Sequence, residues 1–500
     1  MRPRAAGPSV RRTGWRRLRL GLRRTFGRPR GAWTLAAPLL LQELALVGAG
    51  AAMTLLAARL GPAAVAAIGW VEVLAQMLHA LIGAVAIGAT VAAAQAVGAA
   101  RRIDDARLTR RLQRRLSPLA ADALALVGVG SLGLSLALWL LREPLVDTLL
   151  PGVEPAVRAH ALAYLAGHIV ADVPAGLVMV AAGLLRGMGR TAAATRIQLV
   201  MTASQLLLAA VCMHGLGWGV DGAALALVLS RLLALAVALR ALAWLWPQPV
   251  AAATTRPARP ATGRLRHVGR ALLARWRRRG WRSLASRQAR AVVRVGWPTA
   301  VESGFFHVGK LLTQALVAGS GTAALAANFI AFSICGFINI PGNALGHAGT
   351  TLIGQSLGAG RPRRAQAQLQ RLHRSARRAL IALALPVAAA APALAALYSA
   401  DAAVQRLAAQ LVWLNALFIP VWAASFVLPA ALRGAADTRH ALAVATVGMW
   451  SCRVLAGWLL GVQAGWGVIG VWLGMFADWS LRGWLFHRRA ESGRWLPPAA

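Results

Sequence analysis

The stretch GWPTAVESGFFHVGKLLTQALVAGSGTAALAANFIAFSICGFINIPGNALGHAGTTLIGQSLGAGRPRR, residues 296–364, decides the fold. Two long apolar runs are joined by a tight turn at Ser320-Gly321-Thr322, and the second run ends in a glycine-rich sequence followed by arginines. A run of about 20 apolar residues crosses a bilayer core of about 30 Å as a helix. The stretch therefore predicts two membrane-spanning helices joined by a short turn.

The same pattern occurs once more in the chain, 260 positions earlier (355 − 95) and without a gap. Residues that shape helices and turns coincide in the pairs Pro38 and Pro298, Gly61 and Gly321, Thr90 and Thr350, Gln95 and Gln355, Gly98 and Gly358, and Arg101 and Arg361. This coincidence indicates a duplicated membrane unit.

Composition extends this interpretation to the whole chain. Of its 500 residues, 58% are hydrophobic, against about 45–50% in ordinary soluble domains. The apolar runs are continuous rather than alternating, which favours helices over a β-barrel. We predict an all-α integral membrane protein with about twelve spans, at 35–58, 64–92, 119–141, 157–184, 192–213, 221–246, 292–318, 323–352, 378–399, 404–430, 440–462 and 466–487.

The net charge of +40 follows the predicted topology. Arginine-bearing connections alternate with short connections that are nearly free of arginine, as the positive-inside rule requires. The pattern predicts a multi-pass membrane protein with both termini in the cytoplasm, and it argues against a nucleic-acid partner. Cys212, Cys335 and Cys452 lie singly in apolar runs and suggest neither a disulfide framework nor a metal site.

Five regions follow from charge and hydropathy. They are a basic cytoplasmic tail (1–34), an amino-terminal six-helix bundle (35–246), a basic cytoplasmic linker (247–291), a carboxy-terminal six-helix bundle (292–489) and a cytoplasmic tail (490–500). Two interpretations of the linker stay open. Its leucines and tryptophans, among them Leu272, Leu273, Trp276, Trp281 and Leu284, form an amphipathic helix at the lipid headgroups, or the segment is a solvated basic linker.

The repeat continues beyond the first two spans of each half. Leu185-Arg186-Gly187 recurs as Leu432-Arg433-Gly434, and Gly217-Trp218-Gly219 recurs as Gly465-Trp466-Gly467. Because each half has an even number of spans, both halves enter the membrane from the same side and are parallel repeats. Two such bundles face to face suggest a transporter with a central site and alternating access.

Taken in chain order, the motifs of this sequence resemble those of a known family. Gly296-x-Pro298-x-x-x-Glu302, Gly321-x-x-Ala324, Gly354-Gln355-x-x-Gly358 and Leu432-Arg433-Gly434 with Asp437-Thr438 are similar to those of the multidrug and toxic compound extrusion (MATE) family. The resemblance covers residues 35–490 and implies an inner-membrane antiporter that expels cationic or amphipathic compounds in exchange for protons or sodium ions. Family members often carry an acid late in the first span, where this chain has Met53.

Ionisable residues inside spans are the functional candidates, because a charge at the centre of a span costs at least about 2.5–3.5 kcal/mol. Glu302 lies one turn after Pro298, which kinks a helix, and Phe305 and Phe306 follow on or near the same face. A carboxylate beside aromatic rings suits an organic cation, and a proton would compete for it. The alternative is a carboxylate neutralised by a partner such as Lys310.

Three further acids are weaker candidates. Glu43, in the first span, is expected to line the amino-half pocket or to cap the interface. Asp172 would replace the acid that is missing at Met53, or form a structural pair with Arg231. Glu72 would contribute to the pocket or only reach toward the membrane surface.

The remaining polar residues have either a transport role or a structural one. Lys310 would set the protonation of the seventh-span glutamate or line a cavity for anionic compounds. Asn339 would offer a polar contact in the cavity or bond a neighbouring helix. Asp478 and Arg482, four residues apart, are predicted to form a structural ion pair, with Arg453 as another candidate partner.

The sequence therefore predicts an ion-coupled antiporter for small organic cations or amphipathic compounds. We expect a monomer in the lipid bilayer, with no cofactor beyond a coupling proton or sodium ion, and a slight preference for protons at Glu302. The alternative is a lipid or lipid-linked saccharide flippase of the same superfamily, which would favour a cationic cavity. An enzyme is disfavoured, because the HExxH, GxSxG and P-loop patterns are absent, and a channel would need a selectivity-filter segment.

Overall fold

The computed structural model describes residues 31–101, 108–246 and 268–496, except 271, 273, 276 and 279. Most of the predicted amino-terminal tail, the first part of the linker, Leu273, Trp276 and the last four residues lie outside the described residues. Within the described ranges the chain is almost entirely helical.

The first half contains six helical rods. They are α2 (Ala32–Ala58), α3 (Pro62–Ala100), α4 (Leu108–Leu149), α5 (Pro155–Gly187), α6 (Thr191–Ala210) continued by the π-helical η1 (Val211–Gly215), and α7 (Gly219–Leu242) followed by the short η2 (Ala243–Leu245).

The second half repeats this arrangement after the turn η4 (Gly280–Ser283). Its rods are α9 (Arg287–Ala318), α10 (Thr322–Gly358), α11 (Pro362–Ala389) with α12 (Ala391–Tyr398), α13 (Ala402–Trp422) continued by η5 (Ala423–Val427) and α14 (Leu428–Arg433), α15 (Thr438–Val447) continued by η6 (Gly448–Ala456) and η7 (Leu459–Gln463), and α16 (Gly467–Glu491).

Each of the twelve predicted spans coincides with one of these rods, so the predicted all-α membrane fold is confirmed. Nine helices in the described part of the chain are long and apolar enough to cross a membrane by themselves, and α11 with α12 makes a tenth span. The remaining two rods, α9 and α16, contain 32 and 25 residues and carry charged residues in their apolar stretches. At about 1.5 Å per residue both are long enough to span.

The ninth span differs from its prediction as one continuous segment, because α11 and α12 meet at an angle of 66°. Proline explains the break. Pro386 lies near the end of α11, and Pro392 occupies the first turn of α12, where its ring and missing N–H prevent the preceding helix from continuing.

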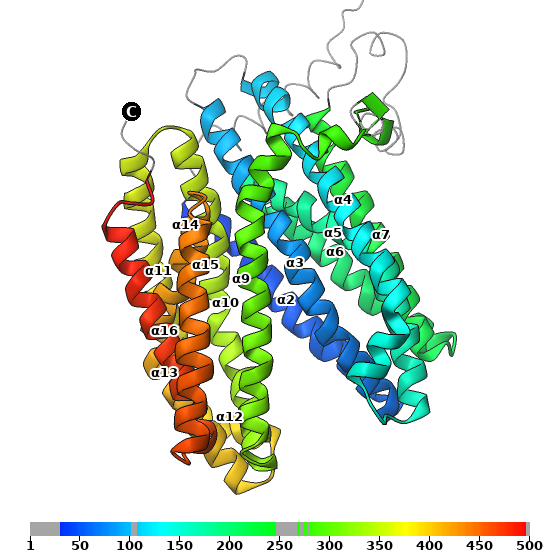
Figure 1. The fold of residues 1–500 in the computed structure, drawn as a ribbon, viewed down its shortest axis with the longest axis vertical. Coiled ribbons are helices and arrows are strands. Elements are labelled where there is room, and N and C mark those ends of the chain that lie inside the picture. Colours follow the sequence, from blue (N-terminus) through cyan, green and yellow to red (C-terminus); the bar gives the residue numbers. More distant parts are fainter. Residues whose placement is uncertain are drawn as a thin grey trace, which may run out of the picture.

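The two halves form two bundles that approach each other at one end and diverge toward the other (Figure 1). We call the end where they meet the arginine-bearing end, because the connections α3–α4, α5–α6, α10–α11 and α14–α15 and the chain before α9 lie there. The first helix of each half crosses over at this end. Leu35 and Leu39 of α2 belong to the hydrophobic core of the second half, and Val292 of α9 belongs to that of the first.

Backbone contacts through small residues join the halves at the arginine-bearing end. A Cβ atom on Gly98 would overlap the carbonyl oxygen of Gln355, and one on Gly358 would overlap that of Gln95. The same two glutamines donate hydrogen bonds across the junction. Gln95 Nε2 bonds the carbonyl oxygen of Gly434 at 3.1 Å, and Gln355 Nε2 bonds that of Gly187 at 2.9 Å. The contacts repeat with the internal symmetry, so each half clamps the other in the same way.

The described part of the linker contacts the first half through a few of its residues. Arg275 donates two hydrogen bonds of 2.8 and 2.9 Å to the carboxylate of Asp122 in α4, and Ser286 donates a third of 2.8 Å. Asp122 is fully buried, and Leu272 packs against the core of the first half. Arg277, Arg278 and Trp281 of the same segment are exposed, so these contacts hold one side of the segment against the first half.

We expect Gly98→Ala and Gly358→Ala to open the arginine-bearing end, because each added methyl group meets a backbone carbonyl that cannot move aside. Spin labels at the exposed Arg114 and Arg371, one in each half and with the native cysteines replaced, would report a longer distance by electron paramagnetic resonance.

Gly130→Ala is the matched control, because a Cβ at Gly130 meets nothing within 4 Å. Alanine stabilises a helix interior by roughly 0.5–1 kcal/mol relative to glycine, so this variant should keep the wild-type distance and fold at least as well. An unchanged distance in both junction variants would contradict the proposed role of these contacts.

Candidate functional site

A small polar cavity of about 160 Å³ lies at the junction between the two halves. It is lined from both halves by α3, α5, α10, η5 and α14, with residues Ile87, Thr90, Arg186, Gly342, Asn343, Gly346, His347, Thr350, Phe426, Ala430 and Arg433. Arg186 and Arg433 are the two arginines of the repeated Leu-Arg-Gly motif. The cavity is therefore basic and lies on the internal symmetry of the chain.

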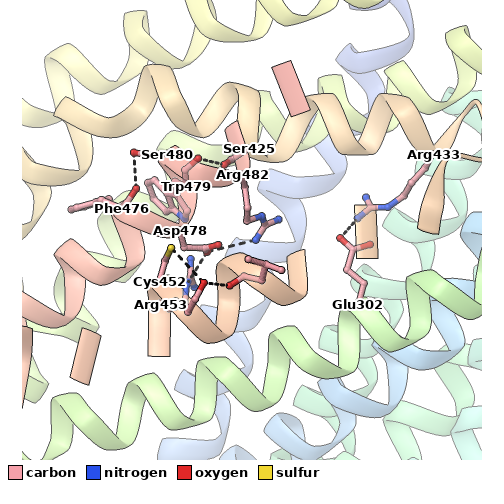
Figure 2. A network of polar contacts seen from close by, with 12 residues as sticks. Glu302, Ser425, Arg433, Cys452, Arg453, Phe476, Asp478, Trp479, Ser480 and Arg482 are labelled. Carbon is pink, nitrogen blue, oxygen red and sulfur yellow. Dashed lines mark hydrogen bonds and ion pairs between the residues drawn. The ribbon is translucent and has the colours of Figure 1, made fainter. Parts of the chain in front are cut away.

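Glu302 pairs with Arg433, whose Nη2 lies 2.7 Å from its Oε1 (Figure 2). The glutamate is 7% exposed, and its Oε2 has no hydrogen-bond partner among the described residues. The sequence named Lys310 as the neutralising partner, and the structure replaces it with Arg433. Lys310 forms no ion pair within the described ranges, and its exposed side chain lies near enough to Arg453 for electrostatic repulsion.

The amino half holds a related arrangement. Glu43 of α2 is half-buried and interacts electrostatically with Arg186 of α5. Glu43 directly follows Gln42, which is the repeat mate of Glu302. Arg186 is the repeat mate of Arg433. Each half thus places a carboxylate from its first helix near the arginine that lines the central cavity.

The two phenylalanines that follow Glu302 have separate partners. The ring of Phe305 is 38% exposed and packs edge-on against Trp450, with 6.3 Å between ring centroids. The ring of Phe306 faces Arg453, whose guanidinium carbon lies 5.6 Å from the ring centroid. The face of the Phe306 ring is thus occupied by Arg453 of the protein itself. The ring of Phe305 is the one of the two that a substrate could reach.

A second polar group fills the amino half between α3 and α5. His79 Nε2 lies 3.3 Å from Asp172 Oδ1, and His168 Nε2 lies 3.5 Å from Glu72 Oε1. Tyr164 donates a hydrogen bond of 2.8 Å to the same oxygen of Glu72. Asp172 and His168 are only 2% and 3% exposed. We call these five residues the amino-half cluster.

Helical spacing explains the amino-half cluster. Glu72 and His79 are seven residues apart on α3, and Tyr164, His168 and Asp172 follow at intervals of four on α5, so each set lies on one face. The two helices run in the same direction through the membrane, so the sets align in order. The sequence identified Glu72 and Asp172 but missed His168 and Tyr164, although the regular four-residue spacing of Tyr164, His168 and Asp172 was a usable signal.

The partner predicted for Asp172 was Arg231, and the structure corrects this as well. The direct partner of Asp172 is His79, whereas Arg231 donates hydrogen bonds to Gln205 at 2.6 Å and to Ser230 at 3.2 Å. Arg231 still interacts electrostatically with both carboxylates of the amino-half cluster.

Asp478 is held between two arginines in the carboxy half (Figure 2). Its Oδ2 lies 3.2 Å from Arg453 Nε and 3.6 Å from Arg482 Nη1, and the aspartate is fully buried. The predicted i, i+4 pair is present, and Arg453 is a second partner. Gly448 allows this arrangement, because a Cβ there would overlap the Asp478 carboxylate.

Two further positions complete the comparison with the sequence. Asn339 is half-buried in α10, and its Oδ1 has no hydrogen-bond partner in the described part of the chain. Met53, at the position of the acid expected from the family, is 8% exposed and packs in the core of the first half.

The chain thus forms two six-helix bundles that meet at a polar cavity lined by both. The family model MatE matches residues 38–211 and 298–459, and the two starting points are offset by the repeat distance found in the sequence. The chain belongs to this family, as the resemblance in its motifs predicted.

Known relatives agree with this assignment. Multidrug resistance protein NorM of Burkholderia vietnamiensis is 31% identical over 220 residues, which cover 40% of this chain and 46% of NorM, so the match spans about half of that relative. Multidrug resistance protein PmpM of Pseudomonas aeruginosa is 27% identical over 474 residues, 88% of this chain and 87% of PmpM. A crystal structure of a mutant of the Vibrio cholerae MATE transporter VcmN shares the fold, with a TM-score of 0.78, 17% identity and coverage of 93% and 97% of the two chains.

We expect Asp478→Asn to destabilise the protein by about 3–5 kcal/mol, because it leaves two buried guanidinium groups without an anion. Thermal unfolding in detergent, followed by intrinsic fluorescence, would show a lower midpoint and a smaller folded yield.

Asp147→Asn is the control with the same chemical change. Asp147 accepts hydrogen bonds of 2.6 and 3.0 Å from Arg158, which lower the pKa of its carboxyl group, but this pair is exposed to solvent. An exposed pair contributes little to stability, so this variant should unfold near the wild-type temperature. Equal effects of the two substitutions would show that burial does not decide the role of Asp478.

Proposed function

We propose that this protein is an ion-coupled antiporter that exports cationic or amphipathic organic compounds by alternating access, and that it is a transporter rather than an enzyme. In this proposal it lies in the inner membrane with both termini in the cytoplasm, and the arginine-bearing end faces the cytoplasm. The observation that carries the proposal is the Glu302–Arg433 pair at a cavity formed by both halves. A proton or a cation can break this pair.

The size of the central cavity supports alternating access. A drug-sized ligand needs a pocket of about 300–1,000 Å³, and the cavity at the junction holds about 160 Å³. A substrate therefore does not fit there while the halves are clamped together. In the proposed cycle the junction contacts separate, the cavity widens toward the cytoplasm, and the halves close at the opposite end.

The chemistry of coupling follows from the charges around Glu302. When ionised, the carboxylate neutralises Arg433 across 2.7 Å. Other charged or titratable groups at the cavity are Arg186 and His347, which line it, and Glu43 beside Arg186. Protonation of Glu302 would leave Arg433 without its partner and make the cavity more positive. An organic cation would then be repelled, so binding of a proton and binding of the substrate exclude each other at one carboxylate, and proton entry promotes substrate release.

The basic lining keeps a flippase as a second candidate function. Two arginines and a histidine line the cavity and no carboxylate does within the described residues, so a pyrophosphate or phosphate headgroup would find complementary charge there. The carboxylates of Glu302 and Glu43 next to those arginines reduce this positive charge, which is why we favour the cation antiporter.

The test uses purified protein in liposomes with an imposed pH gradient and a fluorescent organic cation. We expect wild-type protein to drive transport and Glu302→Gln to reduce it by at least about tenfold while still binding the cation, because the amide keeps the size of the side chain but cannot exchange a proton. A parallel assay with a sodium gradient at constant pH separates the two coupling ions.

Glu143→Gln, an exposed glutamate next to Arg142, is the matched control and should transport like the wild type. Sodium-driven transport that persists in Glu302→Gln would move the coupling site elsewhere. If the wild type moved no cation under either gradient but scrambled a fluorescent phospholipid, the flippase would replace the antiporter.

A further inference from the structure

We propose that the amino-half cluster is a binding site for a divalent transition-metal ion of the zinc class, with His79, His168 and Asp172 as ligands and Glu72 as the fourth donor. The proposal does not rest on the transport function above, because binding of the metal can be measured without any substrate.

The distances of the cluster suit such an ion. One donor atom from each of His79, His168 and Asp172 lies within 4.8 Å of the other two. Zinc–nitrogen and zinc–oxygen bonds of about 2.0–2.2 Å in a tetrahedron place neighbouring donor atoms about 3.3–3.6 Å apart. The His79–Asp172 pair at 3.3 Å and the His168–Glu72 pair at 3.5 Å already have this separation. Bringing the donor atoms of His79, His168 and Asp172, now within 4.8 Å of one another, to this separation would complete the set of three ligands.

One potential ligand atom of the cluster lacks a partner, and a second has only a long contact. Asp172 Oδ2 is buried and accepts no hydrogen bond from the described residues, and His168 Nε2 has only the 3.5 Å contact with Glu72 Oε1. Both side chains are more than nine-tenths buried. A buried polar atom without a partner costs about 1–3 kcal/mol. A metal ion bound between the helices would use both atoms and remove this cost.

The types of ligand select the kind of metal. Two imidazole nitrogens with one or two carboxylate oxygens suit zinc, cobalt, nickel and iron, whereas sodium, magnesium and calcium prefer oxygen ligands. The net charge of the cluster neither favours nor excludes binding of a divalent ion. The two carboxylates and Arg231 give the cluster one negative charge when the histidines are neutral, and a divalent ion would give it one positive charge.

The surroundings of the cluster provide both positioning and access. Tyr164 holds Glu72 through its hydroxyl hydrogen bond, as outer hydrogen bonds usually hold metal ligands. The side chains of His79 and Glu72 are 26% and 39% exposed, so protein does not cover the cluster on that side.

The experiment titrates chelator-stripped protein in detergent with Zn²⁺ against an indicator dye, and with Co²⁺ followed by its visible absorption. We expect one high-affinity ion per chain and the intense absorption of tetrahedral cobalt. His79→Gln and Asp172→Asn should each weaken binding by at least the roughly 10–100-fold that loss of an outer-shell partner costs. His79 is partly exposed, so its variant tests the proposal even if Asp172→Asn does not fold.

Two controls locate the ion. His160→Gln changes a histidine of α5 that lies two turns before His168, and it should bind as the wild type does. His487→Gln removes a separate group in which His487 contacts Glu491 at 3.1 Å and lies beside His373. The proposal is overturned if wild-type protein binds no ion, if His79→Gln and Asp172→Asn bind as tightly as the wild type, or if only His487→Gln loses the ion.

Discussion

The close approach of backbones at the arginine-bearing end is the constraint on which the rest of this structure depends. Gly98 and Gly358 bring α3 and α10 together so tightly that no side chain fits between them, and Gln95 and Gln355 satisfy carbonyl groups of the opposite half. Helices in a membrane gain little from the hydrophobic effect against each other, so small residues and cross-helix hydrogen bonds hold them together. Once these contacts form, the arginines of both Leu-Arg-Gly motifs must line one shared cavity.

Partnering of buried charges is the second organising rule. Within the described residues, Asp122, Glu302 and Asp478 each contact an arginine from another helix or from the docked linker. Asp172 is different, because its direct partner is a histidine. Permanent guanidinium charges neutralise the first three carboxylates, whereas the direct partners of Asp172 and Glu72 in the amino-half cluster include histidines. The two halves have therefore kept one architecture and placed different chemistry in it.

Several features of the site could be predicted from the sequence, and the reason lies in helix geometry. A period of 3.6 residues places Asp478 beside Arg482, and it would also have grouped Tyr164, His168 and Asp172 on one face. The period gives no information on which helices become neighbours. Arg433 lies 131 residues after Glu302, whereas the sequence offered Lys310 only as an example of a neutralising partner. The same limitation led to Arg231 rather than His79 as the partner of Asp172.

The sequence by itself determined the membrane location, the twelve spans, the parallel duplication and the family. These follow from hydropathy, arginine distribution and recurring glycines, all of which act locally along the chain. Only the tertiary structure decided which charges meet, that the linker docks on Asp122, that the ninth span breaks, and that histidines and carboxylates gather between α3 and α5. Each of these depends on contacts between segments far apart in sequence, and their energies are set by packing and burial that no local pattern records.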